Sequence, residues 1–224
     1  MAWRRAAVYR PRPAGRLAEI LDVVNESFPR LQRVGIYANA RDVLRKTDEE
    51  LAELRRRKLK ILYVGLESGD PVTLAAVDKG ATVAEIVAAV RRAQAAGMAT
   101  SVMVLIGLAG RERSLVHARL SAEAINRMAP TYTALLTYTP TPGSPLHQRI
   151  ERGEVELPGP LESVEEIREL GRGLDGPTYF TCNHASNYLP LKGRLPSAKD
   201  GLLRLLDAAA AGAVPLKPEL LRGL

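Results

Sequence analysis

The sequence predicts an α/β fold in which parallel strands alternate with flanking helices. Apolar runs with strand character end near Tyr37, Glu67, Leu108 and Tyr138, so successive strand ends are 30, 41 and 30 residues apart. Repeated βαβ units with right-handed crossovers have this rhythm. The carboxyl ends of parallel strands meet at one edge of a sheet, where α/β enzymes place their chemistry. We therefore expect four strand ends on one rim of a parallel sheet or open barrel.

The first half of the chain shows this alternation clearly. A helix begins near Leu17, where apolar residues recur at helical spacing, and residues 31–38 follow as a short strand. Thr47-Asp-Glu-Glu50 is a capping box that opens the next helix. The near-continuous apolar run at 59–66 predicts a strand buried on both faces. Asp70-Pro71 then suits an N-cap and the first position of a helix.

The second half continues the pattern and then becomes irregular. Thr82-Val-Ala-Glu85 is a second capping box, and its helix should end at Gly97. The other predicted elements are strands at 98–108 and 132–139 and helices at 114–128, 163–170 and 197–211, the last two with serine N-caps. Residues 175–196 are predicted as a long irregular segment, a kind of loop that is often functional.

The composition is that of a globular protein whose charge is unevenly placed. The 224 residues are 46% apolar and 25% charged, with a formal net charge of +7. Residues 1–16 hold five arginines and no acid, which leaves 7 − 5 = +2 for the rest of the chain. We interpret residues 1–15 as a disordered basic tail. A basic tail is not a basic groove, so nucleic-acid binding through it is kept only as an alternative function.

Cysteine content and hydropathy indicate the compartment. The single cysteine, Cys182, excludes an internal disulfide. No apolar run approaches the roughly 18 residues that a membrane helix needs. These features predict a cytoplasmic protein without a membrane partner.

Two charged residues near the second strand end are candidate ligand contacts. Glu67 follows an apolar strand, and a carboxylate there could accept two hydrogen bonds from a ribose diol or could cap the next helix. Lys79 lies 12 residues later, just before Gly80, where it could bind a ligand carboxylate. The more common role of a lysine at a helix end is to complement the helix dipole.

The next two strand ends carry backbone features rather than reactive side chains. Gly107-Leu-Ala-Gly110 would let a ligand approach the backbone closely, but it lacks the Lys-Ser/Thr of a P-loop. The prolines and Gly143 in residues 140–145 could form a rigid wall of an adenine pocket. The alternative for this segment is a helix start at Ser144-Pro145.

A cluster of reactive side chains occupies residues 182–188. Cys182 and His184 are too few for a zinc site, which needs three or four ligands. A Cys–His nucleophile pair and a buried, hydrogen-bonded loop plug both stay open, and no role is assigned to Asn183, His184, Asn187 or Tyr188. We expect His117 and His147 at the surface.

Four motifs taken together resemble the fourth to sixth strands of the radical S-adenosylmethionine superfamily. They are G-L-E-S-G-D at 65–70, D-K-G at 78–80, V-L-I-G-L-A-G-R-E at 104–112 and T-Y-T-P-T-P-G-S-P-L at 137–146. The run N-H-A-S-N-Y-L-P-L at 183–191 is similar to that of an uncharacterised bacterial and archaeal subgroup. The resemblance covers roughly residues 17–224.

The resemblance implies a fold and a cofactor. The fold would be a partial (βα)6 TIM-like barrel at 16–155, lacking its first two strands, followed by a helical and loop extension at 156–224. The cofactor would be S-adenosylmethionine, the substrate being unknown. The implied cofactor contacts are Glu67 and Ser68 toward the ribose, Lys79 toward the methionyl carboxylate, and Ile106, Gly107, Leu136, Thr137, Tyr138 and Thr139 around the adenine. Tyr37 ends the strand where some members carry a ribose-binding acid.

One departure from the family limits the expected chemistry. The family binds a four-iron cluster through C-x3-C-x2-C and cleaves S-adenosylmethionine reductively to a 5′-deoxyadenosyl radical, but this chain has no such motif. We therefore predict an N-terminally truncated fragment, inactive alone, with no catalytic or metal-binding residue assigned. The alternative is a module that binds an adenosyl ligand or a partner without catalysis.

Overall fold

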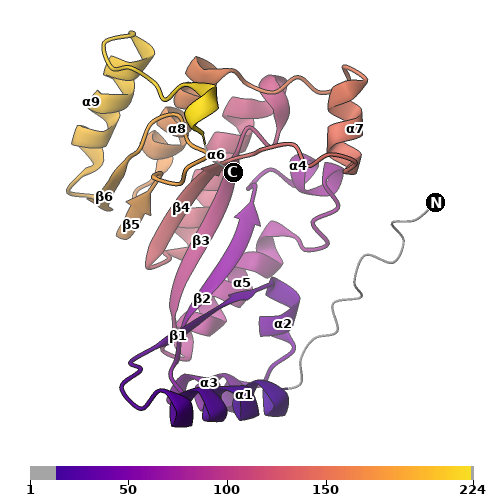
Figure 1. Cartoon of the computed structure of the whole chain (residues 1–224), viewed down its shortest axis with the longest axis vertical. Helices are drawn as coiled ribbons and strands as arrows, with labels where there is room; N and C mark the ends of the chain where they lie inside the picture. The colour runs from indigo at the N-terminus through magenta and orange to yellow at the C-terminus, as the bar shows by residue number, and fades with distance from the viewer. Residues whose placement is uncertain (1–13, 223–224) are drawn as a thin grey trace.

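The chain folds around one mostly parallel sheet with helices on one of its faces (Figure 1). The computed structural model describes residues 14–222. The strands follow the chain order in space: β1 (Val34–Ala38), β2 (Leu59–Glu67), β3 (Ala99–Ile106), β4 (Tyr132–Thr137), β5 (Thr178–Thr181) and β6 (Lys192–Leu195). β1 to β5 are parallel and β6 is antiparallel to β5. The predicted α/β class is confirmed, and the sheet is consistent with part of a TIM-like barrel.

The helices alternate with the strands. They are α1 (Ala14–Ser27), α2 (Ala40–Leu44), α3 (Asp48–Arg56), α4 (Pro71–Ala76), α5 (Val83–Ala95), α6 (Gly110–Met128), α7 (Pro145–Glu151), α8 (Pro160–Gly173) and α9 (Lys199–Ala210), with a 3-10 turn, η1, at Glu219–Leu221. In Figure 1, α5, α6 and α8 lie behind the sheet. Within residues 14–222, no helix has the length and apolar character to cross a membrane. The predicted tail at 1–15 lies outside the described residues except for its last two, which begin α1.

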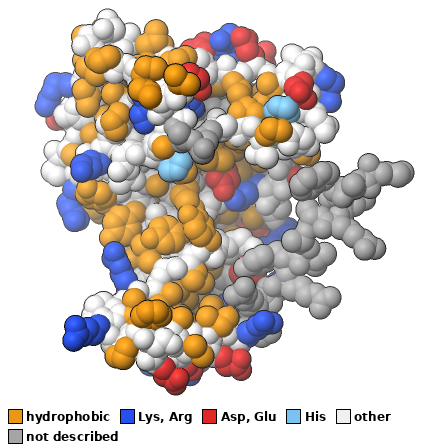
Figure 2. All heavy atoms as spheres, in the orientation of Figure 1, with side chains coloured by type: hydrophobic (Ala, Val, Ile, Leu, Met, Phe, Trp, Pro, Cys, Tyr) orange, Lys and Arg blue, Asp and Glu red, His pale blue; other side chains and the backbone are white. Residues whose placement is uncertain are grey.

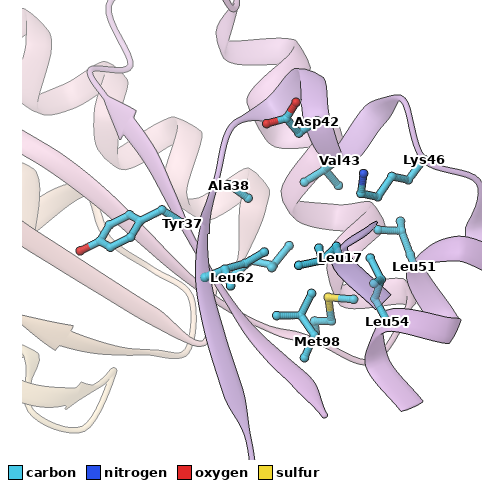
Figure 3. A pocket seen from close by; sticks show the side chains of 12 residues that line it. Leu17, Tyr37, Ala38, Asp42, Val43, Lys46, Leu51, Leu54, Leu62 and Met98 are labelled. Carbon is cyan, nitrogen blue, oxygen red and sulfur yellow. The ribbon is translucent and has the colours of Figure 1, made fainter. Parts of the chain in front are cut away.

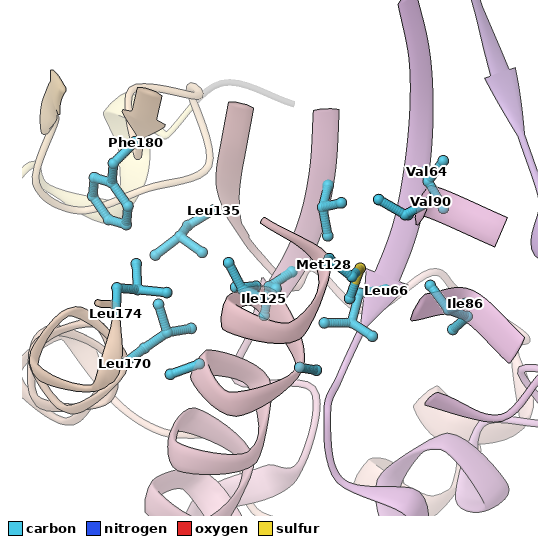
Figure 4. Close-up of a cluster of buried hydrophobic side chains, with 14 of the residues drawn as sticks. Val64, Leu66, Ile86, Val90, Ile125, Met128, Leu135, Leu170, Leu174 and Phe180 are labelled. Atoms are coloured by element: carbon cyan, nitrogen blue, oxygen red, sulfur yellow. The ribbon is translucent and has the colours of Figure 1, made fainter. Parts of the chain in front are cut away.

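The core fills the space between the sheet and these helices. The side chains of Leu66, Val104 and Ile106 have no solvent exposure, because they point toward α5, α6 and α8. Figure 4 shows aliphatic residues from β2, β4, α5, α6 and α8 meeting in this layer. At about 25 cal/mol per Å² of buried apolar surface, such a layer is the main stabilising term of the fold.

The predicted helix starts in the first half are confirmed. Thr47 and Thr82 close full capping boxes with Glu50 and Glu85, and Asp70 caps α4 ahead of Pro71. Three later helices begin elsewhere than expected. α6 starts at Gly110 rather than residue 114, since the left-handed Gly110 (φ +72°) turns the chain directly into the helix. α8 starts at Pro160 rather than 163, and α9 has Ala198 rather than Ser197 as its N-cap, because the Ser197 hydroxyl donates to the carbonyl of Arg194 instead.

The segment 175–196 was predicted as irregular, and this is wrong for its two ends. They form β5 and β6, which continue the sheet beyond β4. Each is only 4 residues long, and their pairing partners are set by tertiary packing rather than by a local pattern. Residues 156–224 therefore contribute strands as well as helices, and α8 packs on α6. The boundary at 155/156 stays a prediction.

Within residues 14–222, no helix covers the other face of the sheet. Register places Tyr37, Tyr63, Ser101, Tyr132 and Tyr179 in one row across five strands of this face. The rings of Tyr37 and Tyr63 are 5.3 Å apart between centroids, and Tyr37 is 76% exposed. Figure 2 shows hydrophobic side chains gathered over the strands on this face. We name it the open face.

An apolar pocket lies on the side of β1 that faces away from the Tyr37 ring. It has a volume of about 270 Å³ and is lined mainly by leucines of α1, α3 and β2, with Met98. In Figure 3 the ring of Tyr37 points away from the other labelled side chains. Tyr37 therefore lines one edge of this pocket, while its ring points toward the open face.

The close approach of the β2 end to α6 gives a first prediction. A Cβ on Gly69 would lie 2.1 Å from the carbonyl oxygen of Leu120, whereas a Cβ on Gly176 would meet nothing within 4 Å. We expect Gly69→Ala to lower the free energy of unfolding by about 1–3 kcal/mol, because the backbone of α6 must move. Urea unfolding measures this, with Gly176→Ala as the matched control. Equal stability of the two variants would contradict the packing described.

Candidate functional site

The carboxyl ends of β2, β3 and β4 form one rim, as predicted. Glu67 ends β2 beside Val104 of β3, and Ile106 ends β3 beside Thr137 of β4. The amide of Tyr138 continues the ladder by donating to the carbonyl of Ile106 at 2.8 Å. Parallel pairing therefore brings the predicted residues of three separate motifs to the same edge of the sheet.

Glu67 and Lys79 form an ion pair on this rim. Lys79 Nζ donates to Glu67 Oε1 at 2.9 Å, and the two side chains are 22% and 25% exposed for Lys79 and Glu67 respectively. Glu67 has a left-handed backbone (φ +61°) after a bulge in β2, which turns its side chain back over the strand. A Cβ on Gly65 would lie 1.9 Å from Glu67 Oε1. A side chain at 65 would therefore displace the Glu67 carboxylate from its present position.

The ion pair has spare hydrogen-bonding capacity. In the described part of the chain, Glu67 Oε2 makes no hydrogen bond, and an ammonium group carries three donors of which Glu67 takes one. A cavity of about 160 Å³ lies beside Lys79, between Gly65 and the residues that follow β1 (38–41). Both groups can therefore contact a polar ligand without first breaking their own contact.

Ser68 faces the interior rather than the rim. Its side chain has no exposure, its hydroxyl lies 2.7 Å from His117 Nδ1, and it accepts the amide of Asp70 at 2.9 Å. The next amide, that of Gly69, donates to the Ser121 hydroxyl at 2.8 Å. The turn after β2 is therefore fixed from below by α6, and Ser68 is a structural residue of that turn.

Asp70 anchors the far end of the same turn. Its carboxylate receives Arg113 in two hydrogen bonds of 2.9 and 3.1 Å, together with the hydroxyl of Thr73 and the first amides of α4. Burial raises the pKa of Asp70, but the hydrogen bonds from Arg113, Thr73 and the Val72 amide together lower it to about 2. The carboxylate is therefore ionised across the physiological range.

His117 was expected at the surface, and this is wrong: it has no exposure. It lies on the side of α6 that faces the strand ends, with Ser114 and Ser121 at helical spacing. Its Nε2 is 3.4 Å from Oε1 of Glu166, which reaches in from α8 and is also fully buried. Placing histidines by their average polarity does not predict that His117 is buried. The helical spacing of Ser114, His117 and Ser121 is the sequence feature that indicates a shared buried face of α6.

Glu166 joins this cluster to the end of β3. Its Oε1 accepts the amide of Gly107 at 2.8 Å, and its Oε2 accepts the hydroxyl of Ser114. Because the Asp70 amide donates to Ser68, the Ser68 hydroxyl is free to donate to His117 Nδ1. The other ring nitrogen, Nε2, lies on the Glu166 side of the imidazole and has no hydrogen-bond partner within residues 14–222. We name Ser68, His117, Glu166 and Ser114 the buried polar cluster.

Burial drives both titratable groups of the cluster toward their neutral forms. It lowers the pKa of His117 to about 4 against the raising effect of Asp70. It raises the pKa of Glu166 to about 7 against the hydrogen bonds from Ser114 and the Gly107 amide. The cluster therefore holds one proton on the carboxyl where an unfolded chain at pH 5–6 would hold it on the imidazole.

The end of β4 is held by the loop 183–188. The Thr137 amide donates to the Ser186 hydroxyl and the Thr137 hydroxyl to Asn187, both at 3.0 Å, while the Asn187 amide group donates to the carbonyl of Leu135. Two amides expected to face an adenine, those of Thr137 and Tyr138, are therefore already used. Thr139 Oγ1 is buried without a hydrogen-bond partner among residues 14–222.

The loop 183–188 is itself fastened by the C-terminal segment. Arg222 donates to the carbonyl of Ser186 at 2.7 Å and lies 3.9 Å from the ring centre of Tyr188. The exposed His184 bonds Ser186 at 2.9 Å, whereas Cys182 is fully buried and burial raises its thiol pKa to about 12. These contacts favour the loop plug over a Cys–His nucleophile pair.

A hollow of about 630 Å³ on the open face lies below the β4 end of the rim. Tyr63, Met103 and Leu136 line it from β2, β3 and β4, and His184 closes one side. Leu136, predicted as an adenine contact, is half-buried there. A ligand bound at the rim would therefore meet an aromatic and aliphatic surface.

The residues present do not fit a four-iron cluster, which the resemblance implies. Such clusters are held by several thiolates, and Cys182 is the single cysteine of the sequence. Its thiol is buried in the core and stays protonated. Within residues 14–222, no group of three histidine, cysteine or acidic side chains is placed to hold a metal ion.

Comparison with known proteins agrees with the sequence motifs. Residues 9–116 match the family model described as Radical SAM superfamily. No curated protein matches the chain.

Solved structures of similar fold are longer chains. An archaeal Elp3 from Methanocaldococcus infernus with an N-terminal deletion has 14% identity and a TM-score of 0.63, covering 91% of this chain and 52% of its own. Coproporphyrinogen III oxidase (HemN) from Escherichia coli, a radical SAM enzyme, has 16% identity and a TM-score of 0.57 over 70% of this chain and 36% of its own. Methylornithine synthase (PylB) has 19% identity and a TM-score of 0.53 over 72% and 44%. The chain thus spans about half or less of each.

The buried polar cluster predicts an unusual dependence of stability on pH. The low pKa of His117 makes stability rise with pH between about 4 and 6.5, while the high pKa of Glu166 makes it fall between about 4.5 and 7. The two effects should cancel between about 4.5 and 6.5. Relative to the parent protein, Glu166→Gln should become more stable as the pH rises through this window, by up to about 1.4 kcal/mol per pH unit. His117→Asn should become less stable over the same window, by a similar amount. Urea unfolding at several pH values measures both slopes, and parallel curves would contradict the assignment.

Proposed function

We propose that this chain, whose residues 9–116 place it in the radical SAM superfamily, binds the adenosyl part of S-adenosylmethionine at the rim of its sheet. The observation that carries the proposal is the Glu67–Lys79 ion pair, whose side chains are about a quarter exposed at the strand ends. A paired carboxylate and ammonium group at one edge match the two polar ends of the ligand. The ribose offers hydroxyl donors, and the methionyl part offers a carboxylate.

Glu67 is the proposed ribose contact. Its Oε2 can accept a ribose hydroxyl while Oε1 keeps Lys79, and hydrogen bonds to a charged group are about twice as strong as neutral ones. Lys79 can hold Glu67 and a ligand carboxylate at once, because its remaining donors face the cavity beside Gly65. The bound ligand would then complete a row of alternating charges.

The proposed adenine wall differs from the sequence-based expectation in its polar group. With the amides of Thr137 and Tyr138 in use, Thr139 Oγ1 is a buried polar atom near this wall that lacks a partner in the described structure. Leaving such an atom unpaired costs about 1–3 kcal/mol, which a hydrogen bond to a base would recover. Ile106, Gly107 and Leu136 supply the apolar and backbone surface around it.

Radical chemistry does not follow from the residues of this chain. In the family, the cluster supplies the electron that cleaves S-adenosylmethionine. Because the residues here do not fit a cluster, we propose a binding function and an inactive fragment of a radical enzyme. The partner-binding and nucleic-acid alternatives stay predictions, the latter resting on residues 1–16, nearly all outside the described structure.

Calorimetry with S-adenosylmethionine and S-adenosylhomocysteine tests the binding proposal. Glu67→Ala and Lys79→Met should each weaken binding about tenfold or more, the loss of one hydrogen bond to a charged group. Glu123→Ala and Lys192→Met, at exposed positions on α6 and β6, are the matched controls and should bind like the parent. An absence of heat at millimolar ligand, or binding that ignores Glu67 and Lys79, would refute the proposal.

Anaerobic reconstitution with iron and sulfide tests the second half of the proposal. The isolated chain should hold far less than one four-iron cluster per molecule, because one buried thiol cannot replace three thiolates. Iron and sulfide analysis with the visible absorption spectrum measures the content, and Cys182→Ser serves as the control. Stoichiometric cluster in the parent chain would show that this reading of its ligands is wrong.

A further inference from the structure

The two strand-end turns of the rim are connected underneath by buried side chains that do not face a ligand. The turn after β2 is held through Ser68 and His117, and the turn after β3 through the amide of Gly107. Both paths meet at Glu166, a residue 59 positions beyond Gly107 in the sequence and on a different helix. Neither the adenosyl contacts nor any catalytic step accounts for this carboxylate.

The turn after β3 needs such a support. Gly107 and Gly110 both have left-handed backbones, with φ of +84° and +72°, so the turn is built from residues with wide conformational freedom. Its outer side packs under Val155 and Pro158, which a Cβ on Gly110 or Gly107 would approach to 3.0 and 3.2 Å. Its inner side has one side-chain hydrogen bond, from the Gly107 amide to Glu166. That hydrogen bond holds the Gly107 amide, and with it the start of the turn, at a fixed position against α8.

Burying a carboxyl group is energetically unfavourable for a contact that has only a structural role. Burying an ionisable group is unfavourable unless donors surround it, and two donors bond Glu166 here: the Gly107 amide and the Ser114 hydroxyl. His117 Nε2 lies 3.4 Å from Oε1 of Glu166, in contact but without a hydrogen bond. The charged groups nearest to them are Asp70 and its partner Arg113, at the other end of the β2 turn. The arrangement therefore ties α6, α8 and both turns to one side chain.

We infer that Glu166 is a positioning residue for the rim: its buried carboxylate fixes the turn at 107–110 and, through His117, keeps that turn in register with the turn at 68–70. As a guide to ligand binding this rests on the proposed function, since the two turns carry Glu67 and Gly107 to opposite sides of the adenosyl ligand. The coupling of the turns is a property of the ligand-free protein and stands on its own.

Amide hydrogen exchange of the ligand-free protein tests the coupling. In Glu166→Leu, exchange at residues 107–110 and at 68–70 should rise about tenfold or more, as for the loss of a hydrogen bond to a charged group, while α5 should change little. Glu166→Gln should restore protection at 107–110, because its amide oxygen can still accept the Gly107 amide. Glu165→Leu, a neighbouring and partly exposed position on α8, is the matched control. Unchanged turns, or an equal rise in every segment, would overturn the inference.

His117→Asn separates the two turns and serves if Glu166→Leu does not fold. Asparagine can still accept the Ser68 hydroxyl but is too short to reach Glu166. Faster exchange in both turns supports the link, and exchange that stays at the parent level in either turn overturns it. Ligand binding is measured separately by calorimetry: S-adenosylmethionine should bind more weakly to Glu166→Leu than to Glu166→Gln. If the parent protein binds none, the proposed function fails while the exchange data still decide the coupling.

Discussion

The polar side of α6 is the constraint on which the rim depends. Ser114, His117 and Ser121 lie at helical spacing on the surface of α6 that faces the ends of β2 and β3, and all three are buried. Each would be destabilising by about 1–3 kcal/mol if left unpaired. The turn after β2 therefore packs against α6 to pair these side chains. The helix thus covers one face of the sheet and also fixes the position of the strand ends.

Glycines make this arrangement sterically possible. Gly69 allows the β2 turn to lie against the backbone of α6, and Gly65 leaves the volume that the carboxylate of Glu67 occupies. In both cases the reason is a close approach and not a turn conformation. The GLESG run thus encodes a packing requirement together with the carboxylate of the Glu67–Lys79 ion pair, and the two cannot be separated by spacing alone.

The open face and the rim are continuous. Parallel sheets are commonly covered on both faces, and here the row of tyrosines from β1 to β5 stands on a face without helices in the described structure. The hollow under the rim is lined by Tyr63, Met103 and Leu136, and Leu136 directly precedes Thr137 at the end of β4. A ligand held by Glu67 and Lys79 would thus lie between charged groups and an apolar floor.

Local sequence patterns are sufficient to predict the alternation of strands and helices, the capping boxes at Thr47 and Thr82, and the positions of Glu67, Lys79 and Gly107 near strand ends. Hydrophobic period, helix caps and strand ends each depend on residues a few positions apart, so they can be recognised without a structure. The remaining features depend on contacts between distant parts of the chain. Strands β5 and β6 are too short to have a pattern of their own, and His117 and Glu166 are 49 residues apart in sequence yet approach to 3.4 Å in the folded chain. Whether Ser68 faces a ligand or the interior also depended on a helix that begins 42 residues later, since burial and hydrogen bonding are properties of the packed chain.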